Sequence, residues 1–495
     1  MKVTVTPAHA LAGEGQRLDA SYHASPGVKA LRTLRDWASA PPPAATPGAP
    51  HLLREPSSGY AARRLERLVD VCVPGGVFIP GRFRRIYVDD PKHGLPWLSP
   101  SDMQRADLSD LRYVSKKYTP MLDRLRIHRR YILLSRSGTI GNLVYVRADM
   151  EGLIGSDDII RIVADPNRIP PGYLYAYLSS PLGRSLIEQK TYGAVIPHIE
   201  AHHVVDLPIP RLDAATEERI HGLIEQAAQL RAEANELIAK ARQDLVLQVD
   251  LPELSLRESL TKGCHIFLSQ SQALLYRSLT AWNYNPITQR IKGTVTKGEY
   301  SLLADVVAKD GIRYGSQFKR IDASPERGIR LLSQTHVFQV APEGRWISRQ
   351  SVPDYRDFMV AQGTILVAAQ GTTGDNELFG HCQFSHRNFE DYMITQHILR
   401  IIPHKDQIAP GYLFAFLSSD FGFQLLRSTA CGTKLLGLIL PNVGEIPIPR
   451  LGGSAESNIA EKIIRGYDKR ADAVALEKKA QSFLSESLHL RSDKV

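Results

Sequence analysis

Apolar residues recur at intervals of three and four in two long stretches of the chain, Asp213–Val246 and Ser454–Leu488. This spacing is typical of a helix with one apolar face, and successive heptads indicate packing against a second helix. Small residues at the first heptad position would let two backbones approach closely, so we expect the two helices to pair with each other. The predicted pairing residues are Ile220, Leu223, Ala227, Leu230, Ala234, Leu237 and Ala241, then Ile459, Ile463, Ala473, Leu476, Ala480 and Phe483.

Shorter apolar runs precede each long stretch and predict strands. Examples are "YILLS", "NLVYV" and "DIIRIV" before the first, and "GTILVAA" and "HILRII" before the second, all bounded by Gly or Pro. The stretch "GYLYAYLSSPLGRSLI" (Gly172–Ile187) predicts a short helix with Tyr173 and Tyr177 in the core. A following "PIPRL" must be extended, because its prolines exclude a helix. The pattern therefore indicates an α+β fold.

The chain repeats itself. "GYLYAYLSSPLGRSLI" matches "GYLFAFLSSDFGFQLL" (Gly411–Leu426) at an offset of 239, and "DLPIPRL" matches "EIPIPRL" at the same offset. Upstream, "SGTIG" matches "QGTTG" and Ser115 matches Ser348 at an offset of 233, and "RFRRI" matches "QFKRI" at 235. Small drifts in a nearly constant offset are what loop insertions produce. The chain is thus predicted to be two tandem copies of one unit.

Each copy is predicted to be a mixed α/β head followed by a long helix. The boundaries predicted are residues 1–212 for the first head, 213–250 for its helix, 251–451 for the second head and 452–495 for its helix. "RLDASYHASP" (Arg17–Pro26) and "SLTAWNYNP" (Ser278–Pro286) are candidate starts of the two copies. Only the first copy carries the linker-like Pro/Ala segment Ala40–Pro50.

Composition narrows the class of protein. The apolar and charged fractions, 43% and 23%, are ordinary for a soluble globular protein. The N-terminus lacks the apolar core of a signal peptide and no apolar run could span a bilayer, so we expect a cytoplasmic protein without membrane contact. Four scattered cysteines argue against a disulfide framework or a cysteine zinc site.

Positive charge is concentrated locally. The net charge is +9, but Arg112–Arg136 alone contains eight Lys/Arg against one acid, Asp123. Basic clusters interleaved with aromatics are typical of surfaces that contact phosphates, although a solvated face remains an alternative for any one cluster. Two heads on helices of about 34 residues, on the order of 50 Å long, could each read one half-site of a duplex.

This ordered set of motifs, present twice and covering nearly the whole chain, resembles the DNA-specificity (S) subunit of type I restriction-modification systems. The matching pieces are "RLDASYHASP", "ILLSRSGTIGN", "PGYLYAYLSSPLGRSLI", "YGAVIPHI", "DLPIPRL" and the long helix. The resemblance implies two target-recognition domains and an antiparallel coiled coil of the two helices. Related phage-defence systems use the same module, so the subtype stays open.

What the resemblance implies for function is a non-catalytic subunit. It would bind double-stranded DNA at a bipartite target and direct DNA methyltransferase subunits, two per chain, and translocating nuclease subunits in some systems. No cofactor is then expected on this chain, since S-adenosylmethionine, and ATP and Mg where a nuclease is present, would belong to the partners.

Candidate DNA contacts fall into two sets. Glycine allows a backbone to approach a ligand closely, so the turns Ser137–Gly141 and Gln370–Gly374 are candidate contact loops, with an ordinary β-turn as the alternative. Candidates for phosphate contact are Arg82, Arg84, Arg85, Lys116, Lys117, Arg129, Arg130, Arg136, Arg313, Lys319, Arg320 and Lys434. Candidates for base reading and for the turns are Ser137, Gly138, Thr139, Tyr192, His198, Gln317, Gln370, Gly371, Thr372 and Asn442.

Enzyme classes are disfavoured. His198 and His202 are spaced as helical metal ligands, but Glu200 does not complete the H-E-x-x-H pattern and the second copy lacks both histidines. The chain has no P-loop, no Asn/Asp-Pro-Pro-aromatic stretch and no G-x-S-x-G elbow. A repeat-built scaffold for protein partners is the remaining alternative, which the basic segment Arg112–Arg136 disfavours.

Overall fold

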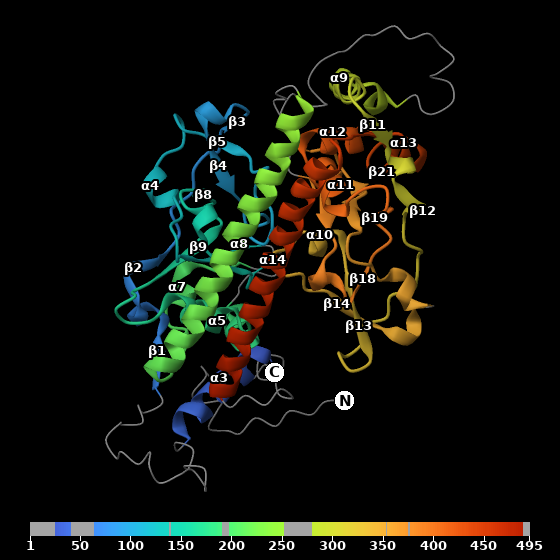
Figure 1. The fold of residues 1–495 in the computed structure, drawn as a ribbon. Helices are drawn as coiled ribbons and strands as arrows, with labels where there is room; N and C mark the ends of the chain where they lie inside the picture. The colour runs from blue at the N-terminus through green and yellow to red at the C-terminus, as the bar shows by residue number, and fades with distance from the viewer. Residues whose placement is uncertain are drawn as a thin grey trace. The chain divides into compact units, whose positions relative to one another are not determined.

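The computed structural model describes residues 25–40, 64–137, 140–190, 198–251, 280–352, 354–374 and 377–488. The chain divides into two compact units (Figure 1). Unit 1 comprises Met1–Gln104, Tyr113–Gln229 and Ala475–Val495, and unit 2 comprises Arg105–Arg112 and Leu230–Val474. Both long helices are therefore shared between the units, whereas the predicted boundaries follow the ends of these helices. The fold is mixed α+β, as the sequence predicts.

Unit 1 is built on a four-stranded antiparallel sheet in the order β2-β9-β6-β7. A second sheet has the order β3-β5-β4-β8, and β1 pairs with β10. The strands are β1 (Arg64–Arg67), β2 (Cys72–Phe78), β3 (Tyr87–Val88), β4 (Gly94–Leu98), β5 (Tyr113–Ser115), β6 (Ile132–Ser135), β7 (Leu143–Tyr145), β8 (Ile154–Gly155), β9 (Ile159–Ala164) and β10 (Pro208–Arg211). The helices are α3 (Pro26–Ser39), α4 (Leu122–Leu125), α5 (Pro171–Ser179), α6 (Pro181–Gln189), α7 (Ala201–Val204) and α8 (Ala214–Val249).

Unit 2 contains a four-stranded antiparallel sheet in the order β12-β19-β15-β17. It also has the sheets β14-β13-β18 and β16-β21-β20 and the pair β11-β22. The strands are β11 (Tyr300–Leu302), β12 (Val307–Arg313), β13 (Gly328–Leu332), β14 (Arg345–Ser348), β15 (Ile365–Ala368), β16 (Gln370–Gly371), β17 (Cys382–Phe384), β18 (Tyr392–Ile394), β19 (Ile398–Pro403), β20 (Ala430–Cys431), β21 (Leu436–Leu438) and β22 (Pro447–Pro449). The helices are α9 (Pro286–Val295), α10 (Gln334–Val337), α11 (Pro410–Leu417), α12 (Asp420–Ser428), α13 (Leu440–Gly444) and α14 (Gly453–Ser487).

The helices α5 and α11 lie in the two cores. Tyr173, Tyr177 and Tyr412 are fully buried, which confirms the predicted core packing of these aromatics. Their hydroxyls donate to carbonyls of the proline strands: Tyr173 to Pro210 O at 2.5 Å, and Tyr412 to Pro449 O at 2.7 Å. A buried hydroxyl needs such a partner. The proline strands that precede both long helices are therefore anchored to the cores by tyrosine.

The buried face of α8 differs from the predicted one in its second heptad position. Leu223, Leu230 and Leu237 are only partly buried. In each case the following residue is buried instead: Ile224, Arg231 and Ile238. On a helix, positions three and four residues after Ile220 both lie close to the same face, so the apolar spacing is compatible with either stripe. The predicted stripe, with its three leucines, is the more apolar of the two, whereas the stripe that is buried includes Arg231. The buried residues of α8 are Glu217, Ile220, Ile224, Ala227, Arg231, Ala234, Ile238, Ala241 and Leu245.

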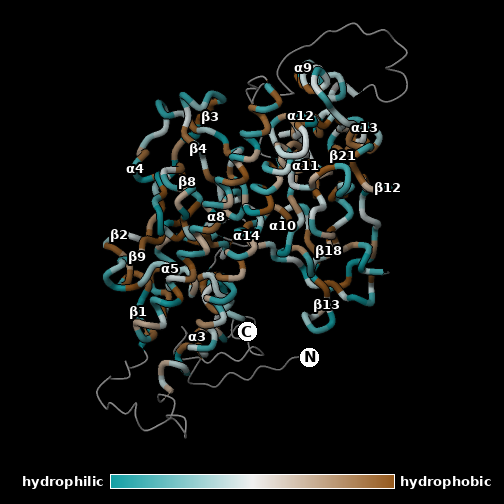
Figure 2. The backbone as a smooth tube through the Cα atoms, viewed as in Figure 1, coloured by the Kyte–Doolittle hydropathy of each residue, from teal (hydrophilic) through white to brown (hydrophobic). Residues whose placement is uncertain are grey.

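The same difference is found in α14, where Leu476 and Phe483, predicted at the second heptad position, are only partly buried. Along both helices, hydrophilic and hydrophobic residues alternate (Figure 2). The buried residues of α14 are Glu456, Ile459, Ala460, Ile463, Gly466, Tyr467, Arg470, Ala473, Ala480 and Leu484.

Charged side chains make contacts between α8 and α14 within each unit. In unit 2, Lys469 Nζ lies 2.6 Å from Glu233 Oε2 and Lys462 Nζ lies 3.2 Å from Asp244 Oδ2. In unit 1, the Arg219 guanidinium lies 3.9 Å from the ring centroid of Phe483. In unit 2 the contacts of α14 move to lower residue numbers as those of α8 move to higher ones, so the two helices run antiparallel there.

Some features noted in the sequence lie outside the described residues. These are the linker-like segment beyond Ala40, the starts of the two copies up to 24 and 279, and Cys264. The three other cysteines are free thiols. Among the described helices, none is both long and apolar enough to cross a membrane.

Candidate nucleic-acid interface

Two loops occupy the same place in the two units. In unit 1 the loop 79–86 follows edge strand β2, and in unit 2 the loop 314–321 follows edge strand β12. Each loop ends on the same hydrogen bond: Ser115 N donates to Ile86 O, and Ser348 N donates to Ile321 O, both at 2.8 Å. These residues are the pairs that the sequence matches between the two copies.

Exposed cations lie on the unit 1 loop and directly after strand β5, to which the loop is hydrogen-bonded. Arg82, Arg84, Lys116 and Lys117 are exposed. The Lys117 ammonium lies 5.3 Å from the ring centroid of Tyr118, whose side chain is 58% exposed. Ammonium and guanidinium groups bind phosphates, and exposed aromatic rings can stack on bases. We call Arg82, Arg84, Lys116, Lys117 and Tyr118 the loop patch.

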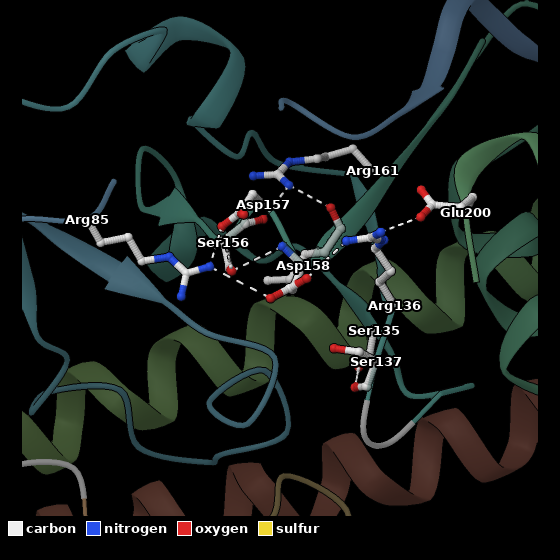
Figure 3. Close-up of polar contacts among 10 residues, drawn as sticks. Arg85, Ser135, Arg136, Ser137, Ser156, Asp157, Asp158, Arg161 and Glu200 are labelled. Carbon is white, nitrogen blue, oxygen red and sulfur yellow. Dashed lines mark hydrogen bonds and ion pairs between the residues drawn. The ribbon is translucent and has the colours of Figure 1, made fainter. Parts of the chain in front are cut away.

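Two of the predicted phosphate contacts, Arg85 and Arg136, form ion pairs with carboxylates (Figure 3). Arg85 Nη2 lies 2.5 Å from Asp157 Oδ1 and 3.7 Å from Asp158 Oδ2. The Arg136 side chain is buried and donates to Asp158 Oδ1 at 3.1 Å and to Glu200. Arg136 thereby joins the end of β6 to the residues before α7. Its position is that of a structural ion pair.

Arg129 and Arg130 contact helix α8. Both guanidinium groups lie within 3.2 Å of Glu225, which also accepts from the Tyr145 hydroxyl at 2.5 Å. Burial raises the pKa of Glu225, but hydrogen bonds from Arg130 and Tyr145 lower it more, so the net shift is downward. The cluster therefore fastens the unit 1 sheet to its helix, although both arginines remain partly solvent-exposed.

In unit 2 the corresponding loop is also basic. Arg313, Gln317, Lys319 and Arg320 are exposed, as is Lys434 before β21. Arg320 Nη2 donates to Gln396 Oε1 at 2.9 Å. Arg320 thus donates a hydrogen bond to a neutral amide, whereas Arg85 in unit 1 donates to a carboxylate.

The glycine turns are held by strand pairing. Ser137 bridges to His198, and Gln370 pairs with Gly437 in β21. The Gln334 side chain donates to Gln370 O at 2.8 Å. Gly371, exposed Thr372 and partly buried Asn442 are described, whereas Gly138, Thr139 and Tyr192 lie outside the described residues.

Arg427 positions the unit 2 turn. This buried arginine of α12 donates to the carbonyls of Phe379 at 2.9 Å, Thr373 at 3.1 Å and Glu377 at 3.0 Å. Glu188 lies beside the unit 1 turn, since a Cβ on Gly141 would be 3.2 Å from its Oε1. The two turns are therefore backed by opposite charges.

An ion pair that the sequence pattern did not predict joins strand to helix in both units. Arg211 donates to Glu217 at 2.9 and 2.8 Å, and Arg450 donates to Glu456 at 2.8 and 3.2 Å. The signal was an acid that follows "PIPRL" at the same distance in both copies. The sequence pattern also did not predict Arg161 and Arg400, which occupy equivalent buried positions in β9 and β19.

The alternative of a metal site finds no support in the described part of the chain. His202 lies with its ring centroid 4.0 Å from that of His203, and His198 is part of the bridge to Ser137. Within the described ranges, no group of three or more His, Cys, Asp or Glu could hold a metal ion.

Three solved structures resemble this chain. An S subunit of a type I restriction-modification system from M. genitalium is 12% identical, covers 86% of this chain and 94% of its own, with a TM-score of 0.34. An HsdS subunit from Thermoanaerobacter tengcongensis is 15% identical, covers 86% and 97%, with a TM-score of 0.27. A chain from a study of assembly and conformational transition of the type I system is 16% identical, covers 87% and 98%, with a TM-score of 0.26. No family model and no curated protein matches the chain.

Proposed function

We propose that this chain is a non-catalytic DNA-specificity subunit that reads a bipartite target. The observation that carries the proposal is the pair of equivalent basic loops, each ending on one recurring hydrogen bond, Ser115 to Ile86 and Ser348 to Ile321. One chain with two such loops on two units is suited to two half-sites. Exposed cations would bind phosphates and set position, while side chains at the glycine turns would read base edges.

The proposal includes a duplicated architecture. The sheet orders β2-β9-β6-β7 and β12-β19-β15-β17, the tyrosine anchors and the Arg–Glu pairs before both helices support two copies of one target-recognition domain. The domains proposed are 1–212 and 251–451, with spacer helices at 213–250 and 452–495. The antiparallel contacts of α8 with α14 support a coiled coil of these helices.

Partners follow from the resemblance. We infer that two DNA methyltransferase subunits bind each chain and carry S-adenosylmethionine, and that nuclease subunits with ATP and Mg join where a restriction activity exists. The base contacts proposed are Ser137, Tyr192, His198, Gln317, Gln370 and Asn442. Arg82, Arg84, Lys116, Lys117, Lys319 and Lys434 are the phosphate contacts that the exposure of their side chains supports best.

The test is single-molecule methylome sequencing of cells that express this chain with the methyltransferase encoded beside it. We expect a methylated motif of two short sequences separated by a fixed gap, which disappears when this chain is deleted. Exchanging residues 1–212 for those of another specificity subunit should change one half-site only. Methylation that is unaltered by the deletion would reject this function and favour a scaffold for protein partners.

A further inference from the structure

The two units differ at the residues that precede the central strands β9 and β19. Unit 1 has Asp157 and Asp158, and the equivalent positions of unit 2 have Gln396 and His397. The contact of the loop arginine is kept, since Arg85 binds Asp157 in unit 1 and Arg320 binds Gln396 in unit 2. Two negative charges that neutralise arginines in unit 1 are therefore missing from the same place in unit 2.

A second difference adds positive charge. Across the outer strand pair of unit 2, Arg313 lies directly opposite Arg400. At the same place in unit 1, Phe78 lies opposite Arg161. Like charges directly opposite one another in a sheet are destabilising. An anion between them would remove this penalty.

The buried arginines Arg161 and Arg400 also differ in the number of hydrogen bonds that their guanidinium groups donate. Arg161 donates to four carbonyls, those of Leu125, Gly155, Ser156 and Ile159. Arg400 is only 3% exposed, yet within the described residues its guanidinium makes a single hydrogen bond, to Phe358 O at 3.2 Å. Nε has no partner there in either Arg161 or Arg400, so the two arginines differ at their Nη atoms; Nδ1 of His397 has no partner there either. Unpaired buried donors are costly and call for a ligand or water.

Arg400 remains charged at neutral pH. Burial lowers its pKa to about 10, with a further lowering by Arg313 and a compensating rise from Asp357. Asp357, whose charge raises the pKa of Arg400, is exposed. A buried charge of this kind is stabilised only by a counter-charge or by good hydrogen bonds.

Gly315 brings the backbone of the loop close to the guanidinium of Arg400. A Cβ on Gly315 would lie 3.3 Å from Nη2 and 3.4 Å from Nη1 of Arg400. Any larger side chain at this position would cover the guanidinium. The backbone of the loop therefore lies against Arg400 at Gly315, and exposed Gln317 and Lys319 follow on the same loop.

We propose that Arg313, Arg320 and Arg400 form an anion site in unit 2 that binds a phosphate of a nucleic-acid backbone. We call it the arginine site. Unit 1 fills the equivalent place with its own carboxylates, Asp157 and Asp158. That the phosphate belongs to DNA rests on the proposed function; the site itself rests on the charges and hydrogen bonds of unit 2.

The test transfers the carboxylates of unit 1 to unit 2 in the full chain as Gln396→Asp with His397→Asp. The control, Gln243→Asp with Gln248→Asp, makes the same charge change at exposed positions of α8. Inorganic phosphate, compared with chloride at equal ionic strength, should raise the melting temperature of the wild type and the control but not of the double variant. In DNA titrations with the methyltransferase present, the double variant should reduce the salt slope by about one.

A second variant distinguishes loss of the arginine site from misfolding of the chain. Arg320→Gln changes an exposed side chain, so it should keep the wild-type circular dichroism spectrum and still weaken the response to phosphate. Specific DNA binding with an unchanged salt slope in both variants would overturn the arginine site and leave the proposed function intact. A phosphate response without any DNA binding by the wild type would instead support the site and reject the function.

Discussion

The guanidinium of Arg211 donates two hydrogen bonds to the carboxylate of Glu217, at 2.9 and 2.8 Å, where strand β10 leads into helix α8. Glu217 also accepts from the backbone N–H of Leu212 at 2.9 Å. Arg450, Glu456 and Leu451 repeat these contacts before α14. The angle at which each long helix leaves its proline strand is thus set by one buried carboxylate.

Removing this carboxylate should destabilise the protein. We expect Glu217→Gln to lower the free energy of unfolding by about 2 kcal/mol, because the partly buried Arg211 loses a charged partner. Arg211 keeps Glu66 at 3.2 Å, which limits the loss. Chemical denaturation measures the effect, and exposed Glu218→Gln is the control, expected to change stability by less than about 0.5 kcal/mol. Equal effects of the two substitutions would contradict this role.

Gly466 should be required for close approach of α14 to α8. A Cβ there would lie 2.9 Å from Ile238 Cγ1 and 3.2 Å from Ala234 O. Gly466→Ala is therefore expected to lower stability by about 1 kcal/mol, since overpacking outweighs the gain in helix propensity. Gly222 of α8 has open space around it, so Gly222→Ala should raise stability by up to about 1 kcal/mol. Melting temperatures that move the same way in both variants would argue against the contact.

Free and paired arginines should behave differently towards DNA. Arg84→Ala and Lys117→Ala, in the loop patch, should each reduce the salt slope of DNA binding by about one and weaken all sequences equally. Arg136→Met should mainly lower the melting temperature, because Asp158 and Glu200 lose their partner. Fluorescence anisotropy at several salt concentrations separates the cases. A changed salt slope with unchanged stability in Arg136→Met would place this arginine at the DNA.

The stability of unit 1 should decline in mild acid. His221 Nδ1 accepts from Gly172 N at 3.0 Å, so this histidine is held neutral. Burial lowers its pKa, with a further lowering by Arg130 and an opposing rise from Glu225 and Glu218. Since the unfolded chain then binds the proton more readily, stability is full above the unfolded pKa of about 6.5 and is lost as pH falls below it. His221→Gln should flatten this part of a melting-temperature profile between pH 7 and 5; an unchanged slope would exclude His221 as its cause.

Several features followed from local sequence. The helices α5, α8, α11 and α14 were predictable because apolar spacing reflects contacts within a few residues along the chain. The extended proline strands before α8 and α14 followed from the missing N–H and the steric restriction of proline. Recurring motifs also matched Ser115 with Ser348, a pair whose hydrogen bonds are the same in both units.

The partners of charged residues could not be read from the sequence. Arg85 meets Asp157 across 72 residues and Arg130 meets Glu225 across 95, so no local pattern reveals either pair. The burial of Arg231 in α8 could not be predicted for a related reason, since an apolar pattern places arginine on the solvent-exposed face of a helix.

The sequence by itself determined the elements, their order and their repetition, because backbone propensity and apolar period depend on neighbouring residues. The tertiary structure alone decided which cations are neutralised and which stay available. That choice depends on carboxylates brought near by folding: unit 1 places Asp157 beside Arg85, whereas unit 2 places neutral Gln396 beside Arg320. Electrostatic energy varies with distance in space, and distance in sequence does not reveal it.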